Sequence, residues 1–185
     1  MDNGASSYCR FISGDESGIV ELIELYRDGL ILYINSFTKN IVEAEDIVED
    51  VFLKLMMRKP HYNGRASFKT WLYIIAGNVA KDYLRKKSRQ GKVCLEDVSE
   101  ILEDETELEN MYLKEEQKIQ LHHSIRKLDS EHQQILWLIY FESMSISEAA
   151  SVVRKSVHAT GNLVYKARKA LKIQLESDGF VYEKI

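Results

Sequence analysis

Residues 62–87, YNGRASFKTWLYIIAGNVAKDYLRKK, join a polar loop to an apolar helical stretch and a basic tail. Rings beside cations suit single-stranded nucleic acid, because unstacked bases stack on aromatic side chains while phosphates attract positive charge. Tyr62 precedes the helical stretch, so its ring could take a base lifted from a duplex. Phe68 and Trp71 could instead fill a hydrophobic core, which is usual for aromatic residues at helical spacing. The basic side chains of the tail would follow the phosphate backbone: Lys81, Arg85, Lys86 and Lys87.

A second pattern for nucleic-acid binding lies near the C-terminus, where a short helix, a tight connection and a long basic helix are expected. Ser145 with Glu148 forms a capping box, and Ser156 can cap the longer helix. This is the layout of a helix-turn-helix, whose second helix enters the major groove of DNA. In that helix Thr160 and Asn162 are suited to base edges. Its cations can hold phosphates: Lys166, Arg168, Lys169 and Lys172.

The net charge of −4 conceals a segregation of sign along the chain. Residues 81–92 carry a balance of +5 and residues 154–172 a balance of +6, so the remainder carries −15. Residues 15–50 have a balance of −8, and residues 93–110 hold eight acids and no base. A block of like charge is often only a solvated face, but two basic blocks on an acidic chain favour two nucleic-acid contacts.

The composition favours long helices and an all-α fold, because one proline and nine glycines are few turn-forming residues for 185. Asn40 with Glu43 predicts a helix start, and Pro60 predicts the end of that helix. Its expected apolar stripe contains Ile47, Val48, Val51, Phe52, Leu55 and Met56. The other predicted helices cover 17–37, 67–87, 106–127, 145–153 and 156–176, with one more opened by a Ser130–Gln133 capping box over Ile135–Phe141.

Several other functions are not expected. Cys9 and Cys94 lack the paired spacing of a zinc or redox site, which fits a reducing, cytoplasmic compartment. No histidine follows a Glu-x-x-His pattern and no phosphate-binding glycine loop occurs, so we expect no enzyme, no metal and no cofactor. His122 and His123 are interpreted as surface residues of a helix. The apolar run Ile135–Phe141 is too short to span a bilayer, so membrane insertion is not expected.

Four segments together resemble a bacterial RNA polymerase sigma factor of the extracytoplasmic-function (ECF) type. They are AEDIVEDVFLKL (44–55), YNGRASFKTWLYIIAGNVAKDYLR (62–85), LDSEHQQILWLIYFESMSISEAASVV (128–153) and SVHATGNLVYKARKALK (156–172). The resemblance implies two small helical domains. One is sigma region 2, a three- to four-helix bundle at 7–88, and the other is sigma region 4, a helix-turn-helix at 114–176. An acidic linker at 89–113 would join them and thread towards the RNA exit channel.

The resemblance also implies a subunit that binds core RNA polymerase and directs promoter recognition, DNA melting and transcription initiation. Its partners would be the β′ clamp and β flap of the polymerase, promoter DNA and, as a further partner, an anti-sigma factor. The polymerase-binding residues by this resemblance are Asp46, Glu49, Asp50 and Phe52. The −10 DNA-binding residues are Tyr62, Asn63, Arg65, Ser67, Lys69, Trp71, Asn78, Lys81 and Arg85. The −35 DNA-binding residues are Ser156, His158, Thr160, Asn162, Tyr165, Lys166 and Arg168.

The chain departs from the sigma pattern at particular positions. Family members commonly have arginines where Ile74 and Gly77 stand, and the helix-turn-helix turn usually has Gly and an aliphatic residue where Arg154 and Lys155 stand. Gly161 in the recognition helix costs about 1 kcal/mol of helix stability relative to Ala. Two alternatives stay open: a helix-turn-helix regulator whose N-terminal half senses a ligand or partner, and a sigma-like protein that does not initiate transcription.

Overall fold

The computed structural model describes residues 3–89 and 116–178, and these ranges contain helices and no strand. The chain divides into two compact units, Met1–Tyr112 and Leu113–Ile185. The expected all-α fold with two small helical domains is confirmed. The predicted linker, 89–113, lies outside the described residues apart from Arg89, and its boundaries stay a prediction. No helix in the described ranges is both long enough and apolar enough to cross a membrane.

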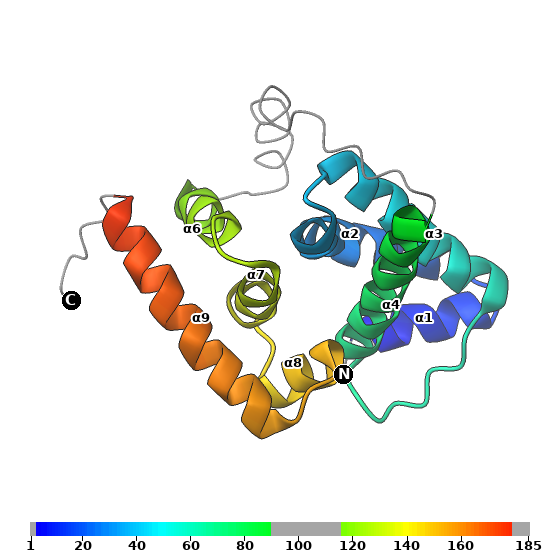
Figure 1. Cartoon of the computed structure of the whole chain (residues 1–185). Helices are drawn as coiled ribbons and strands as arrows, with labels where there is room; N and C mark the ends of the chain where they lie inside the picture. Colours follow the sequence, from blue (N-terminus) through cyan, green and yellow to red (C-terminus); the bar gives the residue numbers. More distant parts are fainter. Residues whose placement is uncertain (1–2, 90–115, 179–185) are drawn as a thin grey trace. The chain divides into compact units, whose positions relative to one another are not determined.

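Within residues 3–89 the first unit has four helices, and α2 packs against each of the other three (Figure 1). The predicted helix at 17–37 is confirmed as α2, and the predicted helix at 67–87 is confirmed as α4. Sequence analysis did not predict α1. The bounds are α1 Asn3–Ile12, α2 Ser17–Thr38, α3 Ile41–Arg58 and α4 Phe68–Arg89.

Helix α3 begins and ends where the sequence predicts. Asn40 is its N-cap, and the Asn40 Oδ1 atom accepts a hydrogen bond of 2.8 Å from the Glu43 amide. Lys59 closes the helix in the left-handed conformation, with φ of 42°, directly before Pro60. The predicted apolar stripe is buried with one correction, because Met56 at its end is 42% exposed.

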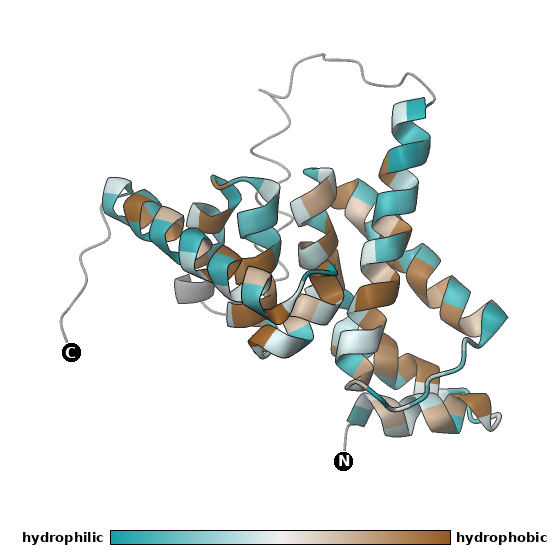
Figure 2. Cartoon of the chain, turned by 60° about the horizontal axis from the view of Figure 1, so that its bottom comes forward, coloured by the Kyte–Doolittle hydropathy of each residue, from teal (hydrophilic) through white to brown (hydrophobic). Residues whose placement is uncertain are grey.

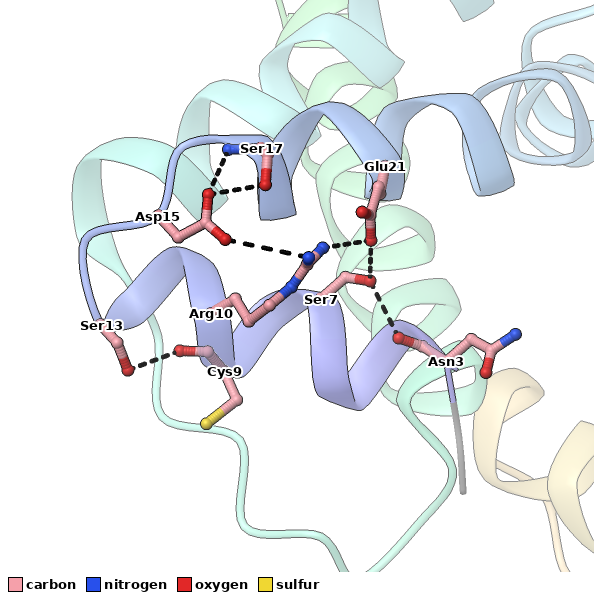
Figure 3. Close-up of polar contacts among 8 residues, drawn as sticks. All are labelled: Asn3, Ser7, Cys9, Arg10, Ser13, Asp15, Ser17 and Glu21. Carbon is pink, nitrogen blue, oxygen red and sulfur yellow. Dashed lines mark hydrogen bonds and ion pairs between the residues drawn. The ribbon is translucent and has the colours of Figure 1, made fainter.

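Helix α1 is held against α2 by close packing and a charged network (Figure 3). A Cβ atom on Gly18 would lie 2.2 Å from the Ser7 carbonyl oxygen, so glycine is required where the helices approach. The Arg10 guanidinium forms an ion pair with Glu21, and the Ser7 hydroxyl donates a hydrogen bond of 2.7 Å to the same carboxylate. The other Arg10 nitrogen lies 3.8 Å from Asp15. Packing and charge together therefore place α1.

Over residues 116–178 the second unit has four α-helices and one π-helical turn, and α9 packs against α6, α7 and α8. The π-helical turn, η1, continues α7 through the apolar run that the sequence assigned to a helix. The Ser145–Glu148 capping box of α8 and the Ser156 cap of α9 are confirmed. The bounds are α6 Glu116–Arg126, α7 Ser130–Leu136, η1 Trp137–Phe141, α8 Ile146–Val153 and α9 Val157–Ser177.

Two sequence predictions in this unit are wrong. Asp129, rather than Ser130, caps α7, and its carboxylate accepts a hydrogen bond of 3.0 Å from the His132 amide. The Gln133 side chain turns back and donates to the Leu128 carbonyl at 2.6 Å instead of closing a capping box. His122 is not a surface residue: it is 4% exposed, and its ring meets the Trp137 ring edge-on at 5.5 Å.

The α1–α2 network predicts a pH-dependent contribution to stability. Hydrogen bonds from Arg10 and Ser7 hold the pKa of the Glu21 carboxyl below its ordinary value. A carboxyl whose pKa is lower in the folded state stabilises the fold above its unfolded pKa, about 4.3, and loses that effect as pH falls further. We expect Glu21→Gln to lower stability at pH 7 and to make the loss of stability below about pH 4.3 less steep. Urea unfolding between pH 7 and pH 3 measures both effects.

The matched control is Glu24→Gln, a change at an exposed glutamate one turn further along α2. This variant should follow the wild-type curve, because Glu24 takes part in no ion pair or hydrogen bond within the described residues. A constant difference between Glu21→Gln and wild type from pH 7 to pH 3 would contradict the assignment.

Candidate nucleic-acid interface

The loop that carries Tyr62 is held in place by its own hydrogen bonds. The Tyr62 hydroxyl donates to the Ala66 carbonyl at 2.6 Å, and the Asn63 Oδ1 atom accepts from the Arg65 amide at 3.1 Å. Gly64 between them has a φ of +69°, which favours glycine. Asn63 and Arg65 are exposed, while Tyr62 is half-buried. The loop therefore presents an amide and a cation around a ring of fixed position.

The Tyr62 ring belongs to an aromatic cluster. Its centroid lies 5.2 Å from that of Trp71 and 5.5 Å from that of Phe68. Phe68 is fully buried, as the core alternative expected, while Trp71 is half-buried. The Tyr8 ring of α1 meets the Trp71 ring at a tilt of 54° with centroids 5.4 Å apart, and the Tyr8 hydroxyl donates to the Pro60 carbonyl at 2.7 Å. Burial raises the pKa of Tyr8 to about 12, so the hydroxyl stays a donor at neutral pH. Tyr8 was not predicted to belong to this site, because the sequence pattern indicated no helix over residues 3–12.

Ser67 and the residues after it serve the start of α4. The Ser67 hydroxyl accepts a hydrogen bond of 3.2 Å from the Thr70 amide, so this residue caps the helix. Lys69 and Asn78 are half-buried on α4. The side chains of Ser67, Lys69 and Asn78 are therefore all partly exposed to solvent, at the start of α4 or along it.

Helix α4 ends in a hydrophilic segment that carries basic side chains (Figure 2). The exposed Lys81 ammonium lies 6.0 Å from the Phe37 ring centroid, and Arg85 forms an ion pair of 3.0 Å with Asp82 one turn earlier. Lys87 forms an ion pair with Glu43 of α3, and this hydrogen bond raises the pKa of Lys87. Lys87 is therefore engaged within the protein.

Helix α3 carries an acidic face with exposed apolar side chains between the acids. Asp46, Glu49 and Asp50 are exposed, as a docking role requires. Phe52 is only 6% exposed and belongs to the core, so we leave it out of this face. Large apolar side chains that the sequence analysis did not assign here are exposed instead: Val42, Leu53, Met56 and Met57, with Met57 at 83%.

Helix α9 presents polar side chains at helical spacing on one exposed face. His158, Asn162 and Tyr165 are exposed, and the Asn162 amide nitrogen lies 3.3 Å from the His158 Nε2 atom. Ser156 is exposed, and its hydroxyl accepts from the Ala159 amide at 3.1 Å, so it serves as the N-cap. Positions 158, 162 and 165 follow the spacing of one helix face.

Thr160 corrects the prediction made for the recognition helix. Its side chain is 0% exposed, so it faces the core of the second unit and not a base edge. The Thr160 hydroxyl is buried and makes no hydrogen bond within the described residues. Helical spacing identified the right helix, but the burial of this one position depends on how α9 is rotated against its neighbours.

The cations of α9 are exposed beside the polar face. Lys166 has no ion pair within the described residues, and the Arg168 guanidinium lies 5.7 Å from the ring centroid of Tyr140. Tyr140, on η1, is 44% exposed and was not predicted to belong to this surface. A cation over an aromatic face is attracted by the ring quadrupole, so Tyr140 limits where Arg168 points. Together α9 and η1 offer cations, a ring and amide groups. No cluster of metal-binding side chains occurs within residues 3–89 and 116–178.

Comparisons with known proteins identify a family for both units of the chain. Residues 22–90 match the family model of sigma-70 region 2, and residues 118–171 match that of sigma-70 region 4. The ECF RNA polymerase sigma factor SigW of Bacillus subtilis is 25% identical over 170 residues, 88% of this chain and 91% of the relative. The RNA polymerase sigma-H factor of Pseudomonas aeruginosa is 28% identical over 171 residues, 88% of this chain and 89% of the relative.

The chain belongs to the ECF sigma factors of RNA polymerase. As a member of this family it is a sigma factor that directs transcription initiation. Two solved structures share the fold of this sigma factor, each with a TM-score of 0.63. One is CnrH in complex with the cytosolic domain of CnrY, at 20% identity over 95% of this chain and 96% of that chain. The other is RpoE of Bartonella quintana with the anti-sigma factor NepR, at 18% identity over 85% and 96%.

The fold explains one departure of this sigma factor from its family's pattern. Gly77 is buried, and a Cβ atom there would lie 3.3 Å from the Tyr33 hydroxyl. Because Tyr33 is itself fully buried, a long side chain at position 77 would have to displace it. Ile74 is half-buried on the same helix, and the structure gives no comparable reason for its identity.

The unbonded hydroxyl of Thr160 predicts a stabilising substitution in this sigma factor. A buried polar group without a hydrogen bond costs about 1 to 3 kcal/mol. We therefore expect Thr160→Val, which replaces the hydroxyl by a methyl group of similar shape, to raise the stability of the second unit by about 1 kcal/mol. Thermal unfolding measures the change. The control is Thr160→Ser, which keeps the hydroxyl but loses a methyl group. A Val variant no more stable than wild type would show that the hydroxyl is satisfied.

Proposed function

We propose that this sigma factor divides its work among three surfaces. The acidic face of α3 binds core RNA polymerase, the Tyr62 loop with α4 captures the −10 element, and α9 reads the −35 element. The observation that carries the proposal is the separation of exposed charge: acids gather on α3, whereas cations gather on α9 and at the end of α4. Membership of the sigma factors supports the same division.

The α3 face has the chemistry of a protein-docking surface. Exposed acids steer a basic partner, and apolar side chains between them supply area that association can bury. Leu53 and Met57 are exposed on the same face as Glu49, so this face offers both charge for steering and apolar area for burial. We assign it to the clamp of the β′ subunit and assign the second unit to the β flap.

The Tyr62 loop suits an unstacked base better than a duplex. The loop places the Tyr62 ring beside Arg65, and the half-buried Trp71 offers a second ring. Base stacking on a ring stabilises binding by about 1 to 3 kcal/mol per base. Lys81 and Arg85 lie further along α4, where they would contact the phosphates that follow the captured base. Melting would then be favoured because only the single strand gains these contacts.

An anti-sigma factor is a further proposed partner. RpoE of Bartonella quintana was solved in complex with the anti-sigma factor NepR. An anti-sigma factor that covers the α3 face or α9 would compete directly with the polymerase or with DNA. We also infer that the chain catalyses no reaction, because sigma factors act as initiation subunits.

Two other functions fit parts of the chain. A helix-turn-helix regulator would account for α8 and α9, and a non-initiating sigma-like protein would account for the whole fold. Neither accounts for the Tyr62 loop as well as a factor that opens DNA, because base capture is useful only where strands separate. A reconstituted transcription assay distinguishes them.

Charge reversal on α3 should remove transcription by weakening polymerase binding. Wild-type chain added to core RNA polymerase should direct promoter-dependent transcription. Asp46→Lys with Asp50→Lys should weaken binding to the core enzyme by about tenfold or more, because complementary charge becomes repulsive. Both binding and run-off transcription are measured.

The control is Glu24→Lys, which makes a similar change on the exposed surface of α2. It should bind and initiate as wild type does. Wild-type affinity in the α3 variant would exclude this face as the docking site. A chain that binds promoter duplex tightly without any core enzyme would instead support the regulator.

Removing cations from α9 should change the salt dependence of DNA binding. We expect Lys166→Ala with Arg168→Ala to weaken binding of the polymerase-bound chain to all duplex sequences. The slope of log K against log salt should fall by about 1 for each lost phosphate contact. The control is Lys127→Ala, because Lys127 lies directly after α6, where it pairs with Asp178. An unchanged slope in the double variant would remove α9 cations from the DNA interface.

A further inference from the structure

Gly161 lies between His158 and Tyr165 along α9, at the half-buried border of the exposed face. Positions 158, 161, 162 and 165 follow the i, i+3, i+4, i+7 spacing that places side chains on one side of a helix. His158, Asn162 and Tyr165 are exposed, so this is the face that the proposed function turns towards the major groove. Glycine at position 161, on the border of this face, leaves a gap in an otherwise continuous row of side chains.

Nothing within the described protein requires glycine at this position. A Cβ atom added to Gly161 would meet no other atom within 4 Å. By contrast, a Cβ on Gly4 would meet the Phe68 ring at 2.5 Å, and one on Gly18 would meet backbone at 2.2 Å. Gly161 also lies within a regular helix and is not among the glycines with positive φ. Neither packing nor backbone conformation therefore accounts for it.

A helix interior is an unfavourable place for glycine, because glycine loses more backbone freedom on folding than alanine does. Glycine is useful where a backbone must approach another molecule closely. Three exposed positions and the half-buried Gly161 place that other molecule outside the described protein, on the side of α9 that carries His158 and Tyr165.

We propose that Gly161 is a specificity-determining position, where the backbone of α9 lies against the edge of a base pair of the −35 element. The absence of a side chain lets the helix sit deeper in the major groove. His158 and Asn162, which flank the gap, then reach base edges that a larger residue at 161 would hold away. This inference rests on the proposed function. It adds Gly161 to the DNA-reading residues, with a role that comes from its lack of a side chain.

The test is a size series at position 161 in the full chain bound to core RNA polymerase. The probe is a duplex whose −35 segment is selected from a randomised library by the wild-type complex, and a scrambled duplex measures non-specific binding. Gly161→Ala should raise the unfolding midpoint by about 4 °C or more while lowering specific affinity about tenfold. Gly161→Leu should lower specific affinity further. Binding to the scrambled duplex should stay within about twofold, because phosphate contacts are retained.

A rise in the unfolding midpoint together with a fall in specific affinity in Gly161→Ala would indicate a steric role at the DNA and not a structural role in the fold. Thr160→Val is the matched control: it changes the neighbouring residue from within the core, so it should raise the midpoint and leave specific affinity unchanged. Alanine and leucine have similar helix propensities, so a loss caused only by altered helix stiffness would be equal in both. An equal loss overturns the inference, as does wild-type or improved specific affinity in Gly161→Ala.

The Lys166→Ala, Arg168→Ala variant distinguishes failure of this inference from failure of the proposed function. If that variant loses DNA affinity and the Gly161 series does not, the role of Gly161 is wrong while α9 remains the reading helix. If neither the variant nor the series changes DNA binding, α9 does not contact DNA and both conclusions fall.

Discussion

The buried ring of Phe68 is the contact on which the proposed N-terminal nucleic-acid surface depends. It lies within 6 Å, centroid to centroid, of the rings of Tyr8, Tyr26, Tyr62 and Trp71. These rings come from α1, α2, the loop and α4, so one side chain joins every part of the first unit that positions the loop. Without Phe68, Tyr62 would keep its hydrogen bond to Ala66 and its contact with Trp71 but lose the ring that joins the loop to α1 and α2, and base capture would require more ordering at the moment of binding.

The second constraint is that basic side chains must stay outside ion pairs within the protein if they are to contact phosphates. Only some of them do. Lys87 is neutralised by Glu43, and Lys155 pairs with Glu131 at 3.0 Å. These two cations stabilise the helix end and the helix-turn-helix turn instead of serving as free phosphate contacts. Lys166 and Arg168 take part in no ion pair within the described residues. The proposed DNA surface of the second unit thus has fewer unpaired cations than its composition indicates.

Local signals predicted much of this fold, and tertiary contacts explain the remainder. Asn40, Ser145 and Ser156 cap helices because capping needs only a side chain and a backbone amide a few residues away. Helix α1 escaped prediction because it depends on its partners, through Gly18 and Arg10. The candidate site follows the same division. Spacing identified the Tyr62 loop, α9 and the burial of Phe52, but the burial of Thr160 and His122 depends on helix rotation, which spacing alone does not determine.

The helix-turn-helix combines features that each lower stability. Arg154 occupies the left-handed region, with φ of 59°, where glycine would be free of strain, and an unbonded Thr160 hydroxyl and a helical Gly161 follow within seven residues. Features of this kind typically cost about 1 kcal/mol each, which is substantial for a unit of this size. Their concentration where α9 begins fits a segment shaped by contact with another molecule, because natural proteins retain strained or weakened elements where function requires them. Arg154 illustrates the exchange: glycine would relax the turn, but it would remove a cation from the approach to the recognition helix.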